Sequence, residues 1–368
     1  MQLKRLVAGM TAALLAVILV FSFPAQGLSA QKAIVLDATT GRVLYEKNAD
    51  TRSLIASTTK IMTALVVCEQ CNVLDRMRIP KEAVGVEGSS IYLEEGEVLT
   101  LQELLYGMML HSGNDAATAL AIYCGGTVEG FVALMNDKAR TLGLSDTHFE
   151  NPHGLDSAAH YSSAKDLASL ASYAMENPIF AQIVSTKEIH IEDRYLRNHN
   201  KLLWQVEGAD GIKTGYTKAA GRILVSSASR DGRRLIVVTI AAPDDWNDHR
   251  LLLNQNFSNY HIEEIVSKGD ILGTAEVAGG METCVALVSD ASFYFPLAAG
   301  ENVEIRLPEP GFVYAPVASG QPAGEAKIYL NNYLVGKVSL IYGDTIEQEP
   351  QQELKLWKRL LGGINHDR

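Results

Sequence analysis

The stretch Ile55-Ala56-Ser57-Thr58-Thr59-Lys60-Ile61-Met62-Thr63-Ala64 places a serine three residues before a lysine where an apolar helical pattern begins. Residues three apart on a helix share a face, so the two side chains can meet. Serine attacks a carbonyl only if a base takes its proton, and neutral lysine is such a base. The helix start also favours developing negative charge. Alone, the pattern equally describes a helix cap followed by a surface lysine.

Two further short motifs follow at long intervals. Ser112-Gly113-Asn114 lies just beyond a predicted helix over 99–110, where a hydroxyl can pass protons and a carboxamide can orient its neighbours. Lys213-Thr214-Gly215 precedes a predicted hairpin, and its glycine lets a ligand backbone lie close to a strand edge. A second cation near Lys60 would lower the pKa of that amine and keep it a base. Each motif alone also fits an ordinary helix junction or a polar edge strand.

The surrounding sequence predicts helices in the middle and strands at both ends of a first domain. Thr100 and Glu103 form a capping box at one helix start, and Asp231-Gly232 is a strong hairpin signal. The predicted helices begin at Ser57 and cover 99–110, 115–123, 128–142 and 164–175, and the predicted strands cover 33–37, 42–46, 223–229 and 233–241. This order predicts an α/β (α+β) sandwich.

Beyond about residue 260 the helical periodicity stops. Short apolar runs over 283–288, 303–307, 326–330 and 333–341 are separated by Gly, Pro and Asn clusters, and Asn331-Asn332 suits a tight turn. We therefore expect a signal peptide over 1–30, a main domain over 31–260, a smaller all-β C-terminal domain over 261–345, and a linker with a tail over 346–368.

The first 30 residues have the pattern of an export signal. Lys4 and Arg5 precede an apolar run over 6–23, Pro24 breaks it, and Ala25-Gln26-Gly27 fits a small-x-small cleavage site, with Leu28-Ser29-Ala30 as a weaker second one. An uncleaved membrane anchor is the alternative, because the run is near spanning length. The sequence therefore predicts a protein that works outside the cytoplasm.

Composition narrows the class of function. The 368 residues are 47% hydrophobic and 20% charged, which is globular, and the formal net charge is −11. An acidic chain without a basic, aromatic stripe predicts no nucleic-acid partner. Four cysteines are too few for a disulfide-built scaffold. Cys68 and Cys71 have redox-motif spacing but fall late in a helical run, so we interpret them as buried or incidentally paired thiols.

Taken together, the three motifs in this order behind an export signal resemble the penicillin-binding-protein and serine β-lactamase superfamily, and within it the D-alanyl-D-alanine carboxypeptidases. The resemblance covers nearly all of the mature chain. It includes the three motifs with their flanks, and also Glu87-Gly88-Ser89-Ser90, Asn151-Pro152-His153-Gly154-Leu155-Asp156 and Asp210-Gly211-Ile212-Lys213-Thr214-Gly215-Tyr216-Thr217. It implies a β-lactamase/transpeptidase-like sandwich followed by a β-rich domain.

The resemblance also implies a mechanism and its residues. Ser57 would attack the carbonyl between the terminal D-alanines of a peptidoglycan stem pentapeptide, and Lys60 would be its base. The backbone N–H groups of Ser57 and Tyr216 would form an oxyanion hole. Ser112 would return a proton to the leaving amine. The remaining residues would order the network and bind the terminal carboxylate: Asn114, Lys213, Thr214, Gly215 and, with an uncertain register, Arg250. β-Lactam antibiotics would acylate Ser57, and no metal or organic cofactor is implied.

Other readings remain open at this point. A Ser-His arrangement through His153 is disfavoured, since the lysine already supplies a base and this histidine follows a proline in a turn. A β-lactamase of the E-x-x-L-N type is disfavoured because we find no such motif between the second and third motifs. A D,D-endopeptidase shares the same acyl-enzyme and is harder to exclude. A catalytically silent wall-binding protein is disfavoured by the intact motifs.

The C-terminal tail predicts a membrane-surface helix. Its apolar residues, Leu354, Leu356, Trp357, Leu360, Leu361 and Ile364, share one side of a helical wheel, and Lys355, Lys358 and Arg359 share the other. A cationic amphipathic helix with a tryptophan suits the interface of an anionic membrane. A short packing helix or a frayed terminus is the alternative.

Overall fold

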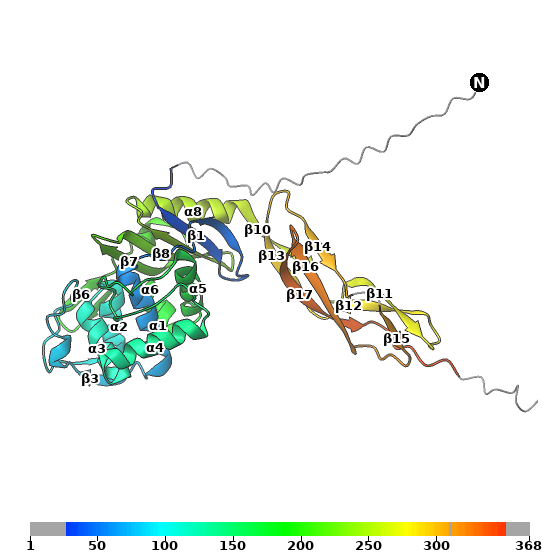
Figure 1. Cartoon of the computed structure of the whole chain (residues 1–368), viewed down its shortest axis with the longest axis horizontal. Coiled ribbons are helices and arrows are strands. Elements are labelled where there is room, and N and C mark those ends of the chain that lie inside the picture. Colours follow the sequence, from blue (N-terminus) through cyan, green and yellow to red (C-terminus); the bar gives the residue numbers. More distant parts are fainter. Residues whose placement is uncertain (1–26, 309–310, 351–368) are drawn as a thin grey trace, which may run out of the picture. The chain divides into compact units, whose positions relative to one another are not determined.

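The computed structural model describes residues 27–308 and 311–350 (Figure 1). The predicted leader over 1–26 and the C-terminal tail over 351–368 lie outside the described residues. The chain divides into two compact units, one ending at Asn254 and the other beginning at Gln255. Each unit has its own apolar clusters, so each is described by itself.

The first unit is built on one antiparallel sheet with the strand order β2-β1-β9-β8-β7. Its strands are β1 (Lys32–Asp37), β2 (Val43–Lys47), β7 (Ala209–Thr217), β8 (Gly221–Arg230) and β9 (Arg233–Ile240). Asp231 and Gly232 both have positive φ between β8 and β9, as a tight hairpin turn needs. The strand with the third motif, β7, is therefore a sheet edge.

Helices cover both faces of this sheet. The α-helices are α1 (Lys60–Gln70), α2 (Leu101–Leu110), α3 (Asn114–Gly125), α4 (Val128–Thr141), α5 (Ala164–Ala174), α6 (Pro178–Ser185), α7 (Leu202–Gln205) and α8 (Asp245–Asn259). In Figure 1, α8 lies above the sheet and the other long helices lie below it. The predicted capping box at the start of α2 is confirmed, because Thr100 and Glu103 bond reciprocally.

Short elements connect these parts: the 3-10 turns η1 (Ala56–Thr59) and η2 (Lys81–Ala83), and the two-stranded pairs of β3 (Arg76–Arg78) with β4 (Val98–Thr100) and of β5 (Glu188–Ile191) with β6 (Arg194–Arg197). The prediction that an α-helix begins at Ser57 is wrong by one turn. Ser57 lies in η1, and α1 begins at Lys60. The helix α8 was not predicted, because its many polar residues interrupt the apolar periodicity that indicates a helix.

The second unit is all β. A six-stranded sheet has the order β14-β16-β17-β12-β11-β15, and β10 pairs with β13. The strands are β10 (Tyr260–Val266), β11 (Ile271–Ala278), β12 (Cys284–Ser289), β13 (Phe293–Ala298), β14 (Val303–Arg306), β15 (Phe312–Tyr314), β16 (Pro322–Leu330) and β17 (Tyr333–Tyr342). Asn331 and Asn332 make the positive-φ turn between β16 and β17. The expected β-rich C-terminal fold is confirmed.

Two negative findings concern only the described residues. Within residues 27–308 and 311–350, no single helix is long and apolar enough to cross a membrane; α3 and α4 reach that length only as a pair bent by 84°. The same residues hold no group of three or more His, Cys, Asp or Glu able to bind a metal. Cys71 is bonded to Cys124 rather than to Cys68, so the two cysteines with redox spacing do not pair with each other.

Candidate active site

The fully buried Lys60 amine lies at the centre of a polar cluster. Its Nζ lies 3.1 Å from Ser57 Oγ, 2.7 Å from Asn114 Oδ1 and 2.7 Å from the His153 carbonyl oxygen. The first two motifs therefore meet in space, as their order predicted. Two of these three partners are carbonyl-type oxygens that only accept, whereas the hydroxyl can also donate.

This partner set suits a neutral amine. A neutral lysine has two N–H bonds and one lone pair, and the two N–H bonds match the two obligate acceptors, Asn114 Oδ1 and the His153 carbonyl. The lone pair then faces Ser57 Oγ. Burial and, next, the charge of Lys213 lower the pKa of Lys60 well below its usual value, while Asp115 acts in the opposite direction. A neutral amine in this position could accept a proton from the Ser57 hydroxyl.

The backbone around Ser57 is held in an uncommon conformation. Ala56, which precedes it, has a φ of +45°, in the left-handed region that costs energy for a residue with a Cβ. A Cβ on Gly154 would stand 1.9 Å from the Ala56 carbonyl oxygen, and one on Gly215 would stand 3.3 Å from Ser57 N. The loop after α4 and the edge strand β7 thus both pack closely on the turn that contains Ser57, so β7 approaches the Ser57 backbone N–H.

The second motif is fixed by the loop before β4. Asn114 Nδ2 donates to the Glu87 carbonyl at 2.5 Å, and Asn114 N donates to the Ser89 carbonyl at 2.7 Å. A Cβ on Gly88 would stand 2.5 Å from Asn114 Nδ2, so the loop can approach this closely only with glycine there. The side-chain amide therefore points its oxygen at Lys60. Ser112 is buried between α2 and α3 with a φ of +63°.

Asp115 holds the loop before β4 through several hydrogen bonds. Its carboxylate accepts from Ser90 Oγ at 2.6 Å and from the backbone N–H groups of Ile91 and Leu93 at 3.0 and 3.1 Å. No role for Asp115 was predicted from the sequence. Through these bonds the Asp115 carboxylate holds the loop that orients Asn114.

The third motif lies on β7 with alternating exposure. Lys213 is buried, Thr214 is half-buried and Tyr216 is 65% exposed. Lys213 Nζ donates to the Thr214 carbonyl at 2.9 Å, and burial lowers the pKa of Lys213 to about 7. A cation therefore lies on the same side of the sheet as Lys60 and acts on its titration.

Arg250 is placed on α8. Its Nη2 donates to Asn247 Oδ1 at 2.6 Å, one helical turn earlier, and its side chain is exposed. The neighbouring His249 faces the sheet, with Nδ1 2.6 Å from Ser226 Oγ and Nε2 2.9 Å from Thr239 Oγ1. Ser57, Lys60 and Asn114 are thus in direct hydrogen-bond contact, and β7 lies beside them. Arg250 instead bonds to Asn247 within its own helix.

His153 contributes through its backbone. Its carbonyl oxygen accepts from Lys60, and burial and then the charge of Lys60 lower the pKa of its imidazole to about 3. Behind it, His160 Nδ1 accepts from Glu150 N, so its Nε2 carries the proton and donates to Thr59 Oγ1 at 2.7 Å. A backbone acceptor leaves no side-chain signature: the family resemblance included residues 151–156 but implied no role for the His153 carbonyl.

Comparison with known proteins identifies the family of this chain. Residues 20–244 match the family described as D-alanyl-D-alanine carboxypeptidase, and residues 260–348 match the C-terminal domain of penicillin-binding protein 5. The chain therefore belongs to the D-alanyl-D-alanine carboxypeptidase family. Like its family it is a serine-type carboxypeptidase that acts on peptidoglycan stem peptides and binds β-lactams, which confirms the predicted fold, enzyme class and substrate class.

Individual relatives agree with this. The chain is 34% identical to the Bacillus subtilis D-alanyl-D-alanine carboxypeptidase DacF, over 80% of each chain. It is 32% identical to Escherichia coli DacC, over 88% of this chain and 86% of that one. Penicillin-binding protein 5 from Haemophilus influenzae superposes with a TM-score of 0.74 at 28% identity, over 88% and 98% of the two chains. The DD-transpeptidase of Streptomyces K15 superposes with a TM-score of 0.61 at 36% identity, over 63% and 98%.

Proposed function

We propose that Ser57 is the nucleophile of this carboxypeptidase and Lys60 its general base. The observation that carries the proposal is the partner set of Lys60: two obligate acceptors match the two N–H bonds of a neutral amine, which leaves its lone pair for Ser57 Oγ. Lys60 takes the hydroxyl proton as Oγ adds to the carbonyl between the two terminal D-alanines. The C–N bond then breaks, the acyl group stays on Ser57 as an ester, and water hydrolyses that ester.

Two backbone N–H groups stabilise the developing oxyanion in this proposal. Ser57 N lies against Gly215, and the N–H of the next residue, Tyr216, is the second donor. These donors are fixed before the reaction, so they act on charge that exists only in the transition state. Ser112 passes the proton to the leaving amine from the loop between α2 and α3, and Asn114 holds Lys60 in place.

The terminal carboxylate of the substrate is bound by Lys213 and Thr214 in this proposal. A buried ammonium beside an edge strand attracts an anion strongly, since little water screens it. Gly215 lets the peptide lie close to β7. Arg250 stays a prediction as an additional carboxylate ligand: comparing penicillin acylation by the wild type and Arg250→Gln tests it, and an unchanged rate contradicts the role.

We also propose that the protein is exported and that its leader is cleaved before it acts outside the cytoplasm. Ser29 Oγ and Ala30 N donate to Asp248 Oδ2 at 2.8 and 2.9 Å, and Ala30 is buried. Cleavage at Ala25-Gln26-Gly27 keeps this contact in the mature chain, whereas cleavage after Ala30 removes it. The contact therefore favours the first site. Anchoring by the tail is tested by deleting 353–368 and fractionating cells; unchanged membrane association contradicts it.

One experiment tests the nucleophile and the base-activated chemistry together. Intact-mass spectrometry after penicillin treatment should show a single covalent adduct, which peptide mapping places on Ser57. A pentapeptide ending in D-Ala-D-Ala should release free D-alanine. Ser57→Ala should show neither result, and Ser145→Ala, which alters an exposed hydroxyl outside the Lys60 cluster, should retain both. Labelling of Ser57→Ala would overturn the assignment.

A further inference from the structure

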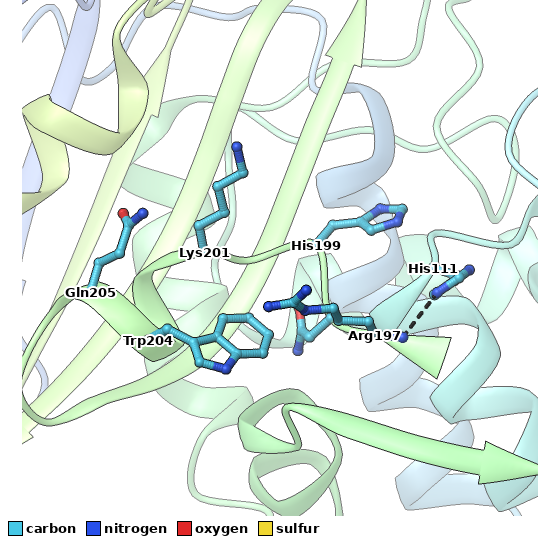
Figure 2. Close-up of a pocket in the computed structure, with 7 residues that line it drawn as sticks. His111, Arg197, His199, Lys201, Trp204 and Gln205 are labelled. Atoms are coloured by element: carbon cyan, nitrogen blue, oxygen red, sulfur yellow. Dashed lines mark hydrogen bonds between the residues drawn. The ribbon is translucent and has the colours of Figure 1, made fainter. Parts of the chain in front are cut away.

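A cavity of about 650 Å³ lies beside the proposed active site and is not used by the chemistry above. It is lined by His111, Arg197, His199, Lys201 and Trp204, among others (Figure 2). The methyl side chain of a D-alanine leaving group fills only a small part of such a volume, which is within the usual range for ligand pockets.

The walls of this cavity continue from the two residues proposed to handle the leaving group. On one side His111 directly precedes Ser112, the proposed proton donor to the leaving amine. On the other side, Asn200 Nδ2 donates to the Gly211 carbonyl at 2.7 Å, which fixes the lining segment two residues before Lys213 on β7. The His199 backbone N–H donates to the Leu110 carbonyl at 3.2 Å and joins the two walls.

The direction of β7 decides which part of a substrate reaches the cavity. Tyr216 is proposed to face the reacting carbonyl, and Lys213 with Thr214 to face the terminal carboxylate. Continuing in the same direction for two more residues, roughly 7 Å, reaches Gly211 and the cavity wall. The cavity therefore lies beyond the leaving residue rather than on the acyl side.

The lining has the chemistry of an anion site with a flat apolar wall. Figure 2 shows the Arg197 side chain extending over the Trp204 indole, and its guanidinium carbon lies 4.9 Å from the ring centroid. Stacking of this kind holds the guanidinium in place. Glu188 contacts Arg197 Nε at 3.3 Å. Lys201 adds a second cation to the lining.

The two histidines do not supply this charge at neutral pH. His111 and His199 stack with ring centroids 5.0 Å apart, and His111 Nε2 accepts from Arg197 N. Burial, Lys213 and His111 lower the pKa of His199 to about 4, and burial lowers that of His111. The cations of the lining at pH 7 are therefore Arg197 and Lys201, in a chain whose formal net charge is −11.

We propose that this cavity is a leaving-group subsite for an acidic side chain, so that the enzyme also hydrolyses D-Ala–D-X bonds in which X carries a carboxylate beyond its terminal one. The inference rests on the proposed function of Ser57. The reaction is the same acyl transfer: the C–N bond to the nitrogen of X breaks as the ester to Ser57 Oγ forms. The Ser57 proton reaches the departing amine, and water then releases the peptide acid.

The test compares three acetylated peptides that end in D-Ala-D-Ala, D-Ala-D-Glu and D-Ala-D-Gln. D-Glu and D-Gln have almost the same shape and differ in charge, so the ratio of their kcat/KM values reports recognition of the carboxylate. We expect the wild type to favour D-Glu over D-Gln by about fivefold at low salt, the range of a partly exposed ion pair. High salt should bring the ratio toward one.

Two variants and one control assign the effect to the cavity. Arg197→Gln and Lys201→Gln should each lower the ratio, and the double variant should bring it to one. Lys187→Gln removes the same charge from an exposed residue 6.0 Å from the Trp204 ring that does not line the cavity, so it should keep the ratio and D-alanine release. A ratio compares substrates on one preparation and is unaffected by partial loss of folded enzyme.

Each outcome has one meaning. A wild-type ratio near one, or a ratio that both lining variants leave unchanged, overturns the subsite. An absence of both D-alanine release from D-Ala-D-Ala and a penicillin adduct on Ser57 overturns the proposed function instead. Penicillin acylation together with no selectivity for D-Glu leaves the nucleophile assignment standing and removes the subsite alone.

Discussion

The two units of the chain bury their polar groups in different ways. The first unit buries charged side chains in its interior, among them Lys60, Lys213 and Asp115. In the described part of the second unit from Tyr260 onward, Ser289 is the buried polar residue, and the lysines, such as Lys337 on β17, lie at the surface. Burying a charge costs free energy unless partners offset it.

This difference shows that the free-energy cost of burying charged side chains falls on the first unit, which contains the candidate active site. The first unit has a large apolar cluster, and its buried amines lie in the same unit, largely shielded from water. The second unit has several small clusters between its strands. Buried lysines with lowered pKa values are typical of sites that need a base, so the contrast favours chemistry in the first unit.

Replacing the buried base should have the largest effect. Lys60→Met keeps much of the side-chain length but removes the lone pair that faces Ser57 Oγ. We expect acylation by penicillin to slow by about 10²- to 10⁴-fold, the range of general-base contributions. Stopped-flow or gel-based labelling with a fluorescent penicillin measures the rate constant.

The matched control comes from the second unit. Lys337→Met removes an exposed lysine whose Nζ lies 2.9 Å from Glu325, and acylation should stay the same. If Lys60→Met acylates as fast as this control, the amine is not the base and the contrast between the two units has no catalytic meaning.

A core truncation in the second unit should affect stability without affecting chemistry. Ile328 is fully buried and packs with Val266 and Val338. Ile328→Ala should lower the free energy of unfolding of this unit by about 2–5 kcal/mol, the usual cost of removing a buried aliphatic side chain. Denaturant unfolding measures it, and the penicillin acylation rate of the folded protein should match the wild type. A parallel loss of acylation would show that the units do not act independently.

The sequence predicted those parts of the site that side chains carry in short motifs. Ser57 and Lys60 meet because three residues make about one helical turn, even though this turn is a 3-10 turn rather than the start of α1. The His153 carbonyl and the loop held by Asp115 were not predicted, because backbone acceptors and loop anchors have no residue signature. Arg197 and Trp204 escaped notice because only the folded chain brings their segment beside Ser112.

Periodicity explains which elements were predicted. Helices with one apolar face and capped ends, such as α2 and α5, match the sequence pattern closely. The polar helix α8 was missed, because its buried residues include Asp245, Asp248 and His249, which bond to other polar groups and break the apolar period. A buried polar face cannot be distinguished from an exposed one in a single sequence.

The buried histidine of α8 should make the first unit sensitive to acid. Burial lowers the pKa of His249 to about 3, so the folded state favours the neutral imidazole. The unfolded chain binds a proton below about pH 6.5, and stability is therefore lost as the pH falls from 6.5 toward 3. Between pH 6.5 and 5 this one group should cost about 2 kcal/mol.

Comparing variants isolates that contribution. His249→Gln should unfold with a shallower loss of stability between pH 6.5 and 5 than the wild type, measured by urea unfolding at each pH. His261→Gln, which alters an exposed histidine on β10, should keep the wild-type slope. Identical slopes in all three proteins would show that His249 is not held neutral.

The alkaline limb of the pH profile sharpens the role of the second buried lysine. Burial lowers the pKa of Lys213 to about 7, so above that pH the amine loses the charge proposed to bind the substrate carboxylate. Acylation by penicillin should then fall by about tenfold per pH unit above the pKa, once Lys60 is already neutral.

Lys213→Arg keeps its charge at every accessible pH, so its acylation rate should not fall at high pH, even if its maximum rate is lower. The shape of the profile is the readout, because a looser fit of the larger guanidinium lowers the rate at all pH values alike. If the acylation rate of Lys213→Arg still falls at high pH, another group is responsible for that fall. Lys213 would then act only by lowering the pKa of Lys60.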